Sequence, residues 1–461
     1  MVAQILAAFY LSVCTLTHST STLLPDIPTT PVLRVDLSNL NAADKVATIK
    51  QHLQHSTEPV VFLHSRTAEW DAIEKWKSTN YLSTMFDNKL LNVKVAGTPV
   101  FTLYALDSKR PNEMLLQGGT QETVRMYQYE EMSLPTLFQD PSETGKYAYY
   151  SGELPHDMQK DVHLHELVVD HVSHNMSRGI LWIGNRGTTA QLHYDRSINM
   201  FAQIVGQKRF YLYAPENWRH LYLHPSFSGS RRQCRYKFSL SEDYEEYQYS
   251  PAATGENVSE TCGQKKAISA TLSPGELLYV PPFYFHTVVS LSKKTMSYSV
   301  LSPSSEEFHY SSALYARVDF QNLGKPGTRK HRLGVKLYID KILSALDQTN
   351  VIRSLYDSRH GPMNGVGISR LPDENDHAVD ALWCTFSSKL ERYRVEKLLG
   401  KRKLQQAVKN VKMVFQKSIK NVGATEILLH DLIEELLVFA TVAADGEERR
   451  VARALQYCWM L

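Results

Sequence analysis

The sequence carries little net charge, few cysteines and no long apolar run beyond its first residues. Its 51 basic and 48 acidic side chains leave a formal charge of +3, which is too small to indicate a nucleic-acid partner. From residue 23 onward no segment is apolar enough to cross a membrane. Apolar residues make up 43% of the 461 positions, as is typical of globular proteins, and this length allows one large core or two to three domains.

The N-terminus has the pattern of a secretory signal peptide. A short apolar run at residues 5–16 is followed by small residues at 19–22, and the run is too short to span a bilayer comfortably. No Lys or Arg precedes it, so a buried first strand or helix is the alternative. Glycosylation sequons at Asn175 and Asn257 agree with secretory entry. We therefore expect a signal peptide over residues 1–22 and a protein of the secretory pathway, either in the endoplasmic reticulum lumen or secreted.

The few cysteines form an even set once Cys14 is removed with the signal peptide. Cys234 and Cys262 lie in the same long insertion, so we expect them to pair with each other. A bond between Cys384 and Cys458 would then follow by elimination. Buried thiols are the alternative for all four.

A metal-binding pattern occurs at His193-Tyr194-Asp195. Residues i and i+2 of an extended strand point to the same side, so His193 and Asp195 can aim at one point while Tyr194 faces away. If His286 joins them from a neighbouring strand, the three side chains cover one face of a metal ion and leave the other face open. Two imidazoles and one carboxylate in this arrangement are typical of non-haem Fe(II) oxygenases.

The residues around this pattern predict the strands that it needs. The short H-x-D motif occurs often by chance, so this context is what favours a metal site. Residues 191–215 indicate two strands joined by a turn at 205–207, where Gly206 can take the positive φ that the turn demands. Residues 274–286 begin with a Pro-Gly turn signal, continue as a short apolar strand, break at two prolines and end on His286.

Residues 180–301 resemble the JmjC/cupin family of 2-oxoglutarate-dependent oxygenases, and within it the branch of the hypoxia-factor asparaginyl hydroxylase. The matching motifs are H-Y-D at 193–195, Asn199, F-A-Q-I-x-G-x-K-R at 201–209, and P-G-E-L-L-Y-V-P at 274–281 followed by His286. The resemblance implies a double-stranded β-helix (jelly roll) core, an Fe(II) centre and 2-oxoglutarate as co-substrate. It makes His193, Asp195 and His286 the iron ligands.

The same resemblance assigns residues to a 2-oxoglutarate pocket. Lys208 matches the lysine that pairs with the far carboxylate of 2-oxoglutarate, where a buried ammonium would form a charge-assisted anchor. A solvated turn lysine is the alternative. Tyr149 resembles the tyrosine that donates to the same carboxylate, and Tyr150 is an equally placed rival. Asn199 also matches and could line the pocket, or it could bond to a loop instead.

Two positions depart from the family pattern. Relatives have a threonine three residues before the first histidine, in contact with the cofactor. Here Ala190 stands in that place, which leaves Thr189, with Thr188 before it, as the candidate contact. Relatives also have an asparagine fifteen residues beyond the last histidine, and here that residue is Leu301. Both differences bear on the substrate and the fine geometry and leave the metal triad intact.

The chain as a whole predicts a mainly β protein with added helices. We expect an α/β segment over 23–150, a jelly-roll catalytic core over 151–305 with an insertion at 225–266, and a helical region over 306–461. Predicted strands lie at 58–63, 91–95 and 99–104, and a helix at 68–76. An apolar stripe from Leu404 to Val422 and an apolar run at 427–441 predict two C-terminal helices. Because relatives often dimerise through such helices, they could form a homodimer or merely cap the barrel.

These observations favour an Fe(II)- and 2-oxoglutarate-dependent oxygenase that uses O2 to hydroxylate a protein or peptide. Hydroxylation is preferred to demethylation because the match is to the hydroxylase-like branch and the chain shows no chromatin-reading module. One alternative is a cupin-fold binding protein that has lost turnover, of which Ala190 and Leu301 would be signs. Another is a Zn- or Mn-loaded cupin of the isomerase or storage type, which has no need of Lys208.

Overall fold

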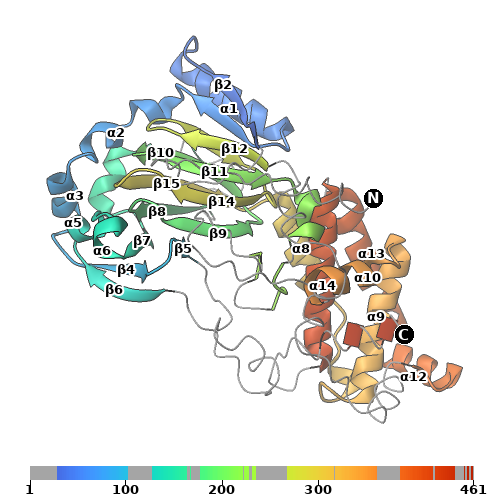
Figure 1. Ribbon diagram of the computed structural model, residues 1–461. Helices are drawn as coiled ribbons and strands as arrows, with labels where there is room; N and C mark the ends of the chain where they lie inside the picture. The colour runs from blue at the N-terminus through green and yellow to red at the C-terminus, as the bar shows by residue number, and fades with distance from the viewer. Residues whose placement is uncertain are drawn as a thin grey trace, which may run out of the picture.

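The computed structural model describes most of the chain from Thr29 onward. Two β-sheets enclose an apolar interior, and a group of helices lies at one end of them (Figure 1). The residues described are 29–101, 127–163, 167, 177–221, 223–227, 231–234, 267–315, 317–360, 385–418, 421–441, 451, 454, 455, 458 and 459. The expected signal peptide, both sequon asparagines, Cys262, Cys384 and most of the expected insertion lie outside these residues.

Eight antiparallel strands form the double-stranded β-helix that the resemblance implied. Four lie in the order β13-β10-β15-β8 within one sheet, and four in the order β12-β11-β14-β9 within the other. Because the chain passes repeatedly from one sheet to the other, the two sets close around one interior. The strands are β8 (Arg178–Gly184), β9 (Thr189–Tyr194), β10 (Ile198–Val205), β11 (Lys208–Tyr213), β12 (Ala267–Leu272), β13 (Leu277–Val280), β14 (Phe285–Ser290) and β15 (Thr295–Ser302).

The interior of this barrel is mostly apolar. Phe201 of β10, Phe210 and Leu212 of β11, and Leu278 and Val280 of β13 pack there as one cluster. Alternation along each strand sends the neighbouring side chains outward. The outer face of β10 and β15 packs against the N-terminal segment, and the outer face of β9 packs against the C-terminal helices. The few polar side chains that share the interior are therefore exceptions, and they form the candidate site.

Gly206 makes the predicted turn between β10 and β11. Its φ is 67°, and a Cβ atom at this position would lie 2.2 Å from the backbone oxygen of Lys294. Any other residue would meet both a left-handed backbone and this steric clash. Glycine therefore lets the chain reverse tightly enough for β11 to begin at Lys208.

The N-terminal segment extends both sheets, in line with the strands predicted at 58–63 and 91–95. On the larger sheet, β3 and β2 continue beyond β13, while β7, β4 and β6 continue beyond β8. On the smaller sheet, β1 pairs with β12 and β5 pairs with β9. The bounds are β1 (Thr29–Pro31), β2 (Leu33–Asp36), β3 (Val60–Leu63), β4 (Leu91–Ala96), β5 (Val100–Phe101), β6 (Gln128–Met132) and β7 (Tyr147–Gly152).

The helix predicted at 68–76 was wrong as a single element. The chain forms a 3-10 turn, becomes extended at Trp70 with ψ 134°, and then forms one short α-helical turn. Trp70 and Trp76 are both buried in the cluster that covers the larger sheet, so packing of the two indoles overrides the helical period. The helices of this segment are α1 (Ala42–His55), η1 (Arg66–Glu69), α2 (Ala72–Lys75), α3 (Thr79–Met85), α5 (Leu134–Leu137), α6 (Pro141–Thr144) and η2 (His156–Asp161).

The region after β15 is helical, as predicted, and packs against the outer face of β9 and the turn η5 (Pro215–His220). Its elements are α8 (Ser305–Tyr315), η6 (Gln321–Leu323), α9 (Arg329–Leu346), α10 (Val351–Leu355), the π-helical turn η7 (Tyr356–His360), α12 (Lys389–Leu399), α13 (Lys401–Met413), the π-helical turn η9 (Val414–Ser418) and α14 (Val422–Thr441). None of the helices that the structure describes is long and apolar enough to span a bilayer.

Two details of the C-terminal predictions need correction. The apolar stripe does not run to Val422, which is 67% exposed, because α13 ends at Met413 and a new helix begins at Val422. The predicted bond from Cys234 to Cys262 is also wrong: Cys234 is a buried thiol packed in the apolar cluster beside β9. Cys458 is disulfide-bonded, while Cys384, its expected partner, lies outside the described residues.

Candidate metal centre

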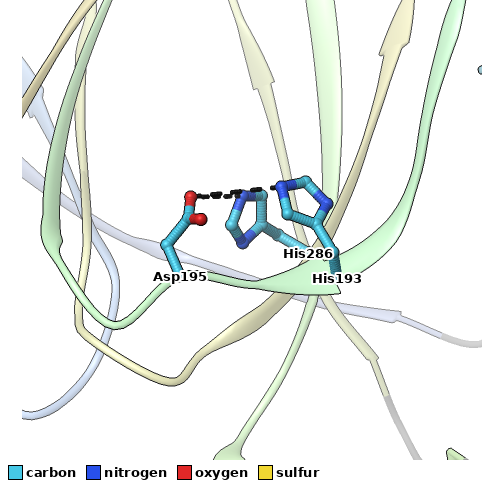
Figure 2. A group of neighbouring side chains, drawn as sticks. All are labelled: His193, Asp195 and His286. Carbon is cyan, nitrogen blue, oxygen red and sulfur yellow. Dashed lines mark ion pairs between the residues drawn. The ribbon is translucent and has the colours of Figure 1, made fainter. Parts of the chain in front are cut away.

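Two adjacent strands bring the predicted triad together. His193 of β9 and His286 of β14 are direct partners in the antiparallel pairing of these strands, and Asp195 follows the end of β9. The Oδ2 atom of Asp195 lies 4.0 Å from Nε2 of His193 and 3.9 Å from Nε2 of His286 (Figure 2). All three ligand atoms lie within 4.8 Å of one another. One divalent ion could therefore contact all three side chains.

Backbone carbonyls orient both imidazoles. Nδ1 of His193 lies 2.6 Å from the oxygen of Gln191, and Nδ1 of His286 lies 3.0 Å from the oxygen of Tyr284. When each Nδ1 carries the proton and donates it to the carbonyl, each Nε2 keeps a lone pair for a metal ion. The two Nε2 atoms are also those that face Asp195. The tautomers fixed by the backbone are therefore those that a metal site requires.

The charges at the site also fit a divalent cation. Burial is the main cause that lowers the pKa of His286 to about 4, and the attraction of Asp195 opposes this only in part. Burial alone would raise the pKa of Asp195, but His193, His286 and Arg232 hold it below its ordinary value. Near neutral pH the site therefore offers a neutral His286 and a carboxylate, which are the forms that bind metal. Two imidazole nitrogens and one carboxylate on one face suit Fe(II).

Lys208 places a buried ammonium group in the same barrel. The residue is 2% exposed, and its Nζ atom crosses the interior to donate a 2.9 Å hydrogen bond to Oγ of Ser297 on the opposite sheet. Among the described residues no carboxylate pairs with it, and burial lowers its pKa to about 7. An unpaired buried cation is costly, and an incoming carboxylate would remove most of that cost. The group thus fits the far carboxylate of 2-oxoglutarate.

The structure separates the two rival tyrosines. The ring of Tyr149 lies 5.8 Å from Nζ of Lys208 and stacks on Trp182 at 5.7 Å. Tyr150, its neighbour on β7, points to the opposite face of the sheet and packs edge-on against Phe86 at 6.2 Å. Tyr149 is therefore the tyrosine that lies beside the proposed co-substrate anchor.

The remaining pocket candidates differ in what their polar atoms do. Asn199 is 7% exposed, lies on the interior face of β10, and its Oδ1 atom has no hydrogen-bond partner in the described structure. Thr189 is fully buried, and its hydroxyl donates a 2.8 Å bond to the oxygen of Gly187. Leu301, which replaces the asparagine of relatives, is the β15 partner of Asn199. Oδ1 of Asn199 can thus accept a hydrogen bond from a ligand, while the Thr189 hydroxyl already donates its proton to the oxygen of Gly187.

The comparison with known families identifies the barrel. The model of the cupin-like domain matches residues 46–301, more than half of the chain. The chain belongs to the cupin-like family. This match confirms the resemblance to JmjC/cupin proteins that the motifs around His193 and His286 indicated.

Individual relatives of this cupin-like protein are distant. JmjC domain-containing protein D of Dictyostelium discoideum is 35% identical over 113 residues, which cover 24% of this chain and 22% of that protein. Jumonji C domain-containing protein 5 of Drosophila melanogaster is 23% identical over 245 residues, 50% of this chain and 52% of the relative. tRNA wybutosine-synthesizing protein 5 of Mus musculus is 24% identical over 252 residues, 52% of this chain and 70% of the relative. The match spans about a fifth of the first relative and about half of the second.

One charged residue at the cupin-like site was not predicted. Arg232, in the expected insertion, has a φ of 72° and places Nη1 at 3.7 Å from Oδ1 of Asp195. Backbone bonds from Tyr194 to Arg232 and from Cys234 to Leu192 hold this segment against β9. Arg231, Arg232 and Arg235 lie close together in the sequence of the insertion, but no local pattern relates them to His193 or His286. Only the pairing with β9 shows that Arg232 reaches the metal centre.

Proposed function

We propose that the protein is an Fe(II)- and 2-oxoglutarate-dependent oxygenase that hydroxylates a protein or peptide substrate. The observation that carries this proposal is the joint presence of two features in one barrel. His193, Asp195 and His286 converge within 4.8 Å, and Lys208 is a buried ammonium with no carboxylate partner among the described residues. A Zn- or Mn-loaded cupin of the storage or isomerase type would explain the first feature and leave the second without a role.

Each side chain has a distinct part in this mechanism. His193, Asp195 and His286 would hold Fe(II) from one side, and Lys208 with Tyr149 would hold the far carboxylate of 2-oxoglutarate. The bound iron and co-substrate supply the chemistry in which O2 converts 2-oxoglutarate to succinate and CO2 and one oxygen atom enters a substrate C–H bond. The apolar side chains of the barrel, among them Phe201 and Phe210, exclude water from the reacting groups.

The substrate class and location extend the proposal. The short apolar N-terminal run and the two sequons support a secretory-pathway enzyme, and a net charge of +3 favours a peptide over a nucleic acid. One relative is named for tRNA modification, so RNA belongs among the substrates to be tested. Exposed apolar residues on the C-terminal helices, including Phe308 and Tyr315 of α8, support a homodimer.

Succinate formation tests the central claim. Purified protein with Fe(II), 2-oxoglutarate and O2 is assayed for succinate, alone and with peptide pools or RNA, and substrates are analysed by mass spectrometry for the gain of one oxygen atom. We expect succinate from the wild-type protein and none from Asp195→Ala. Absence of both succinate and metal uptake would instead favour a catalytically inactive cupin-fold binding protein, and oxygen gain in RNA alone would overturn the peptide assignment.

A further inference from the structure

A buried network of charged side chains joins the metal-site strand to helix α14. The carboxylate of Asp431 accepts hydrogen bonds from Tyr194 Oη at 3.3 Å, Arg196 Nη2 at 2.5 Å and Arg359 Nη1 at 2.7 Å. Less than one turn further along α14, Glu434 accepts a bond from the same nitrogen of Arg359 at 2.6 Å. Asp431, Glu434 and Arg359 are each at most 1% exposed. Such buried charges are tolerable only while they stay paired.

The network also reaches two other elements. Glu434 accepts from Nε2 of His360 at 3.0 Å and from the backbone nitrogen of Ser226 at 2.8 Å. His360 ends the π-helical turn η7, and Ser226 lies at the start of the expected insertion. Helix α14 therefore makes direct polar contacts with the metal-site strand, with η7 and with the start of the insertion, in addition to its apolar packing.

In the sequence, Asp195 lies between Tyr194 and Arg196, which both belong to this network. Each histidine of the triad has a ring nitrogen bonded to a backbone carbonyl, but the Asp195 side chain makes no hydrogen bond to any described residue. Its nearest side-chain nitrogens, on His193, His286 and Arg232, lie 3.7–4.0 Å away. Its placement therefore depends on the backbone that carries it. Tyr194 and Arg196, on either side of it, both donate to Oδ2 of Asp431.

We propose that Asp431 is a positioning residue of the metal centre. By holding the residues on both sides of Asp195, it fixes the direction in which that carboxylate meets a divalent ion. The inference rests on the proposed metal site and assigns the C-terminal helices a part in it beyond capping the barrel or forming a dimer. Removing the Asp431 charge would also take away a carboxylate to which both Arg196 and Arg359 bond, close in sequence and in the fold to a candidate cation site.

Binding of Co(II) to the full chain under anaerobic conditions tests this inference. The titration gives a dissociation constant, and the visible absorption of bound Co(II) reports its ligand geometry. Asp431→Asn keeps the side-chain shape and removes the charge, and we expect affinity to fall by about tenfold or more, with an altered spectrum. Glu426→Gln is the matched control. Glu426 lies on the same helix and accepts bonds of 2.7 Å from Trp218 and 2.5 Å from Arg219, so its loss should lower the melting temperature and leave Co(II) binding unchanged.

A second variant covers the case in which Asp431→Asn does not fold. Tyr194→Phe removes one bond to Asp431 and keeps the ring that stacks on Phe283 at 5.9 Å. We expect a loss of Co(II) affinity of about threefold, less than the roughly tenfold minimum typical of supporting residues around a metal, because this variant removes only one of the two bonds beside Asp195. Wild-type affinity and spectrum in the folded variants would overturn the inference and leave the proposed function standing. Failure of the wild-type chain to bind Co(II) would overturn the proposed function and the inference with it.

Discussion

Replacing Lys208 by methionine should stabilise the protein and abolish 2-oxoglutarate binding. Burial lowers the pKa of this lysine from 10.5 to about 7, which corresponds to a folding penalty of about 5 kcal/mol at about 1.4 kcal/mol per pH unit. Loss of the bond to Ser297 subtracts about 1 kcal/mol from the gain. We therefore expect the free energy of unfolding of the ligand-free variant to exceed that of the wild type by about 2–4 kcal/mol near neutral pH.

The pH dependence of this effect has a definite sign. Because the folded-state pKa is lowered, the penalty in the wild type is fully present below about pH 7 and is relieved as the pH rises toward 10.5. Urea unfolding of both proteins at about pH 6 and about pH 9.5 should therefore show a stability difference that shrinks at the higher pH. Methionine keeps most of the volume, so packing should contribute little to the difference.

Co-substrate binding completes the test. Calorimetric titration with 2-oxoglutarate, with Mn(II) at the metal site, should show an affinity at least about 100-fold lower for Lys208→Met. Lys294→Met is the control, because burial also lowers the pKa of Lys294, to about 8, but this lysine bonds to the backbone oxygen of Lys77 outside the barrel. A Lys208→Met protein that is less stable than the wild type at both pH values, or that binds 2-oxoglutarate as tightly, would refute this prediction.

Three further predictions follow from the same structure. His286→Ala should remove Co(II) binding without unfolding the chain, as seen by titration and circular dichroism. Because burial lowers the pKa of His286 to about 4, protonation of this residue should weaken Co(II) binding, measured by equilibrium dialysis, only as the pH falls from about 6 toward about 4. Asp161→Asn should lower the free energy of unfolding in urea by about 2–4 kcal/mol, because its buried carboxylate accepts bonds from Lys75, Trp76 and Tyr81.

Much of the barrel and of the candidate metal site could be predicted from local patterns in the sequence. The two-residue period of a strand puts His193 and Asp195 on one side, and the glycine at 206 marks the turn into Lys208. The spacing to His286 is not a local signal, because a separation of more than 90 residues says nothing about which strands are adjacent. The motif around the second histidine supplied that information through the family resemblance, and the pairing of β9 with β14 agrees with it.

Features decided by packing were harder to predict. The period of Trp70, Ile73 and Trp76 suits a helix, yet the chain is extended at Trp70 so that two indoles can enter the same apolar cluster. Tyr149 and Tyr150 are equivalent in sequence, and only the pairing of β7 with β8 decides which of them faces Lys208. Such choices depend on which face of a sheet is already covered, and neighbouring residues in sequence do not contain that information.

The partners of Asp431 could be predicted from the sequence only in part. The apolar run at 427–441 predicts a buried helix, and its three acidic residues, Asp431, Glu434 and Glu435, need partners wherever they are buried. Basic partners are therefore expected for the buried ones, but the chain has 51 basic residues and no local rule selects Arg196 and Arg359 for Asp431 and Glu434. The selection is made by the packing of α14 on the outer face of β9, where alternation has already turned Tyr194 away from the candidate metal site. The two-residue period of the strand therefore points His193 and Asp195 toward the candidate metal site. The same period points Tyr194, the residue between them, toward helix α14.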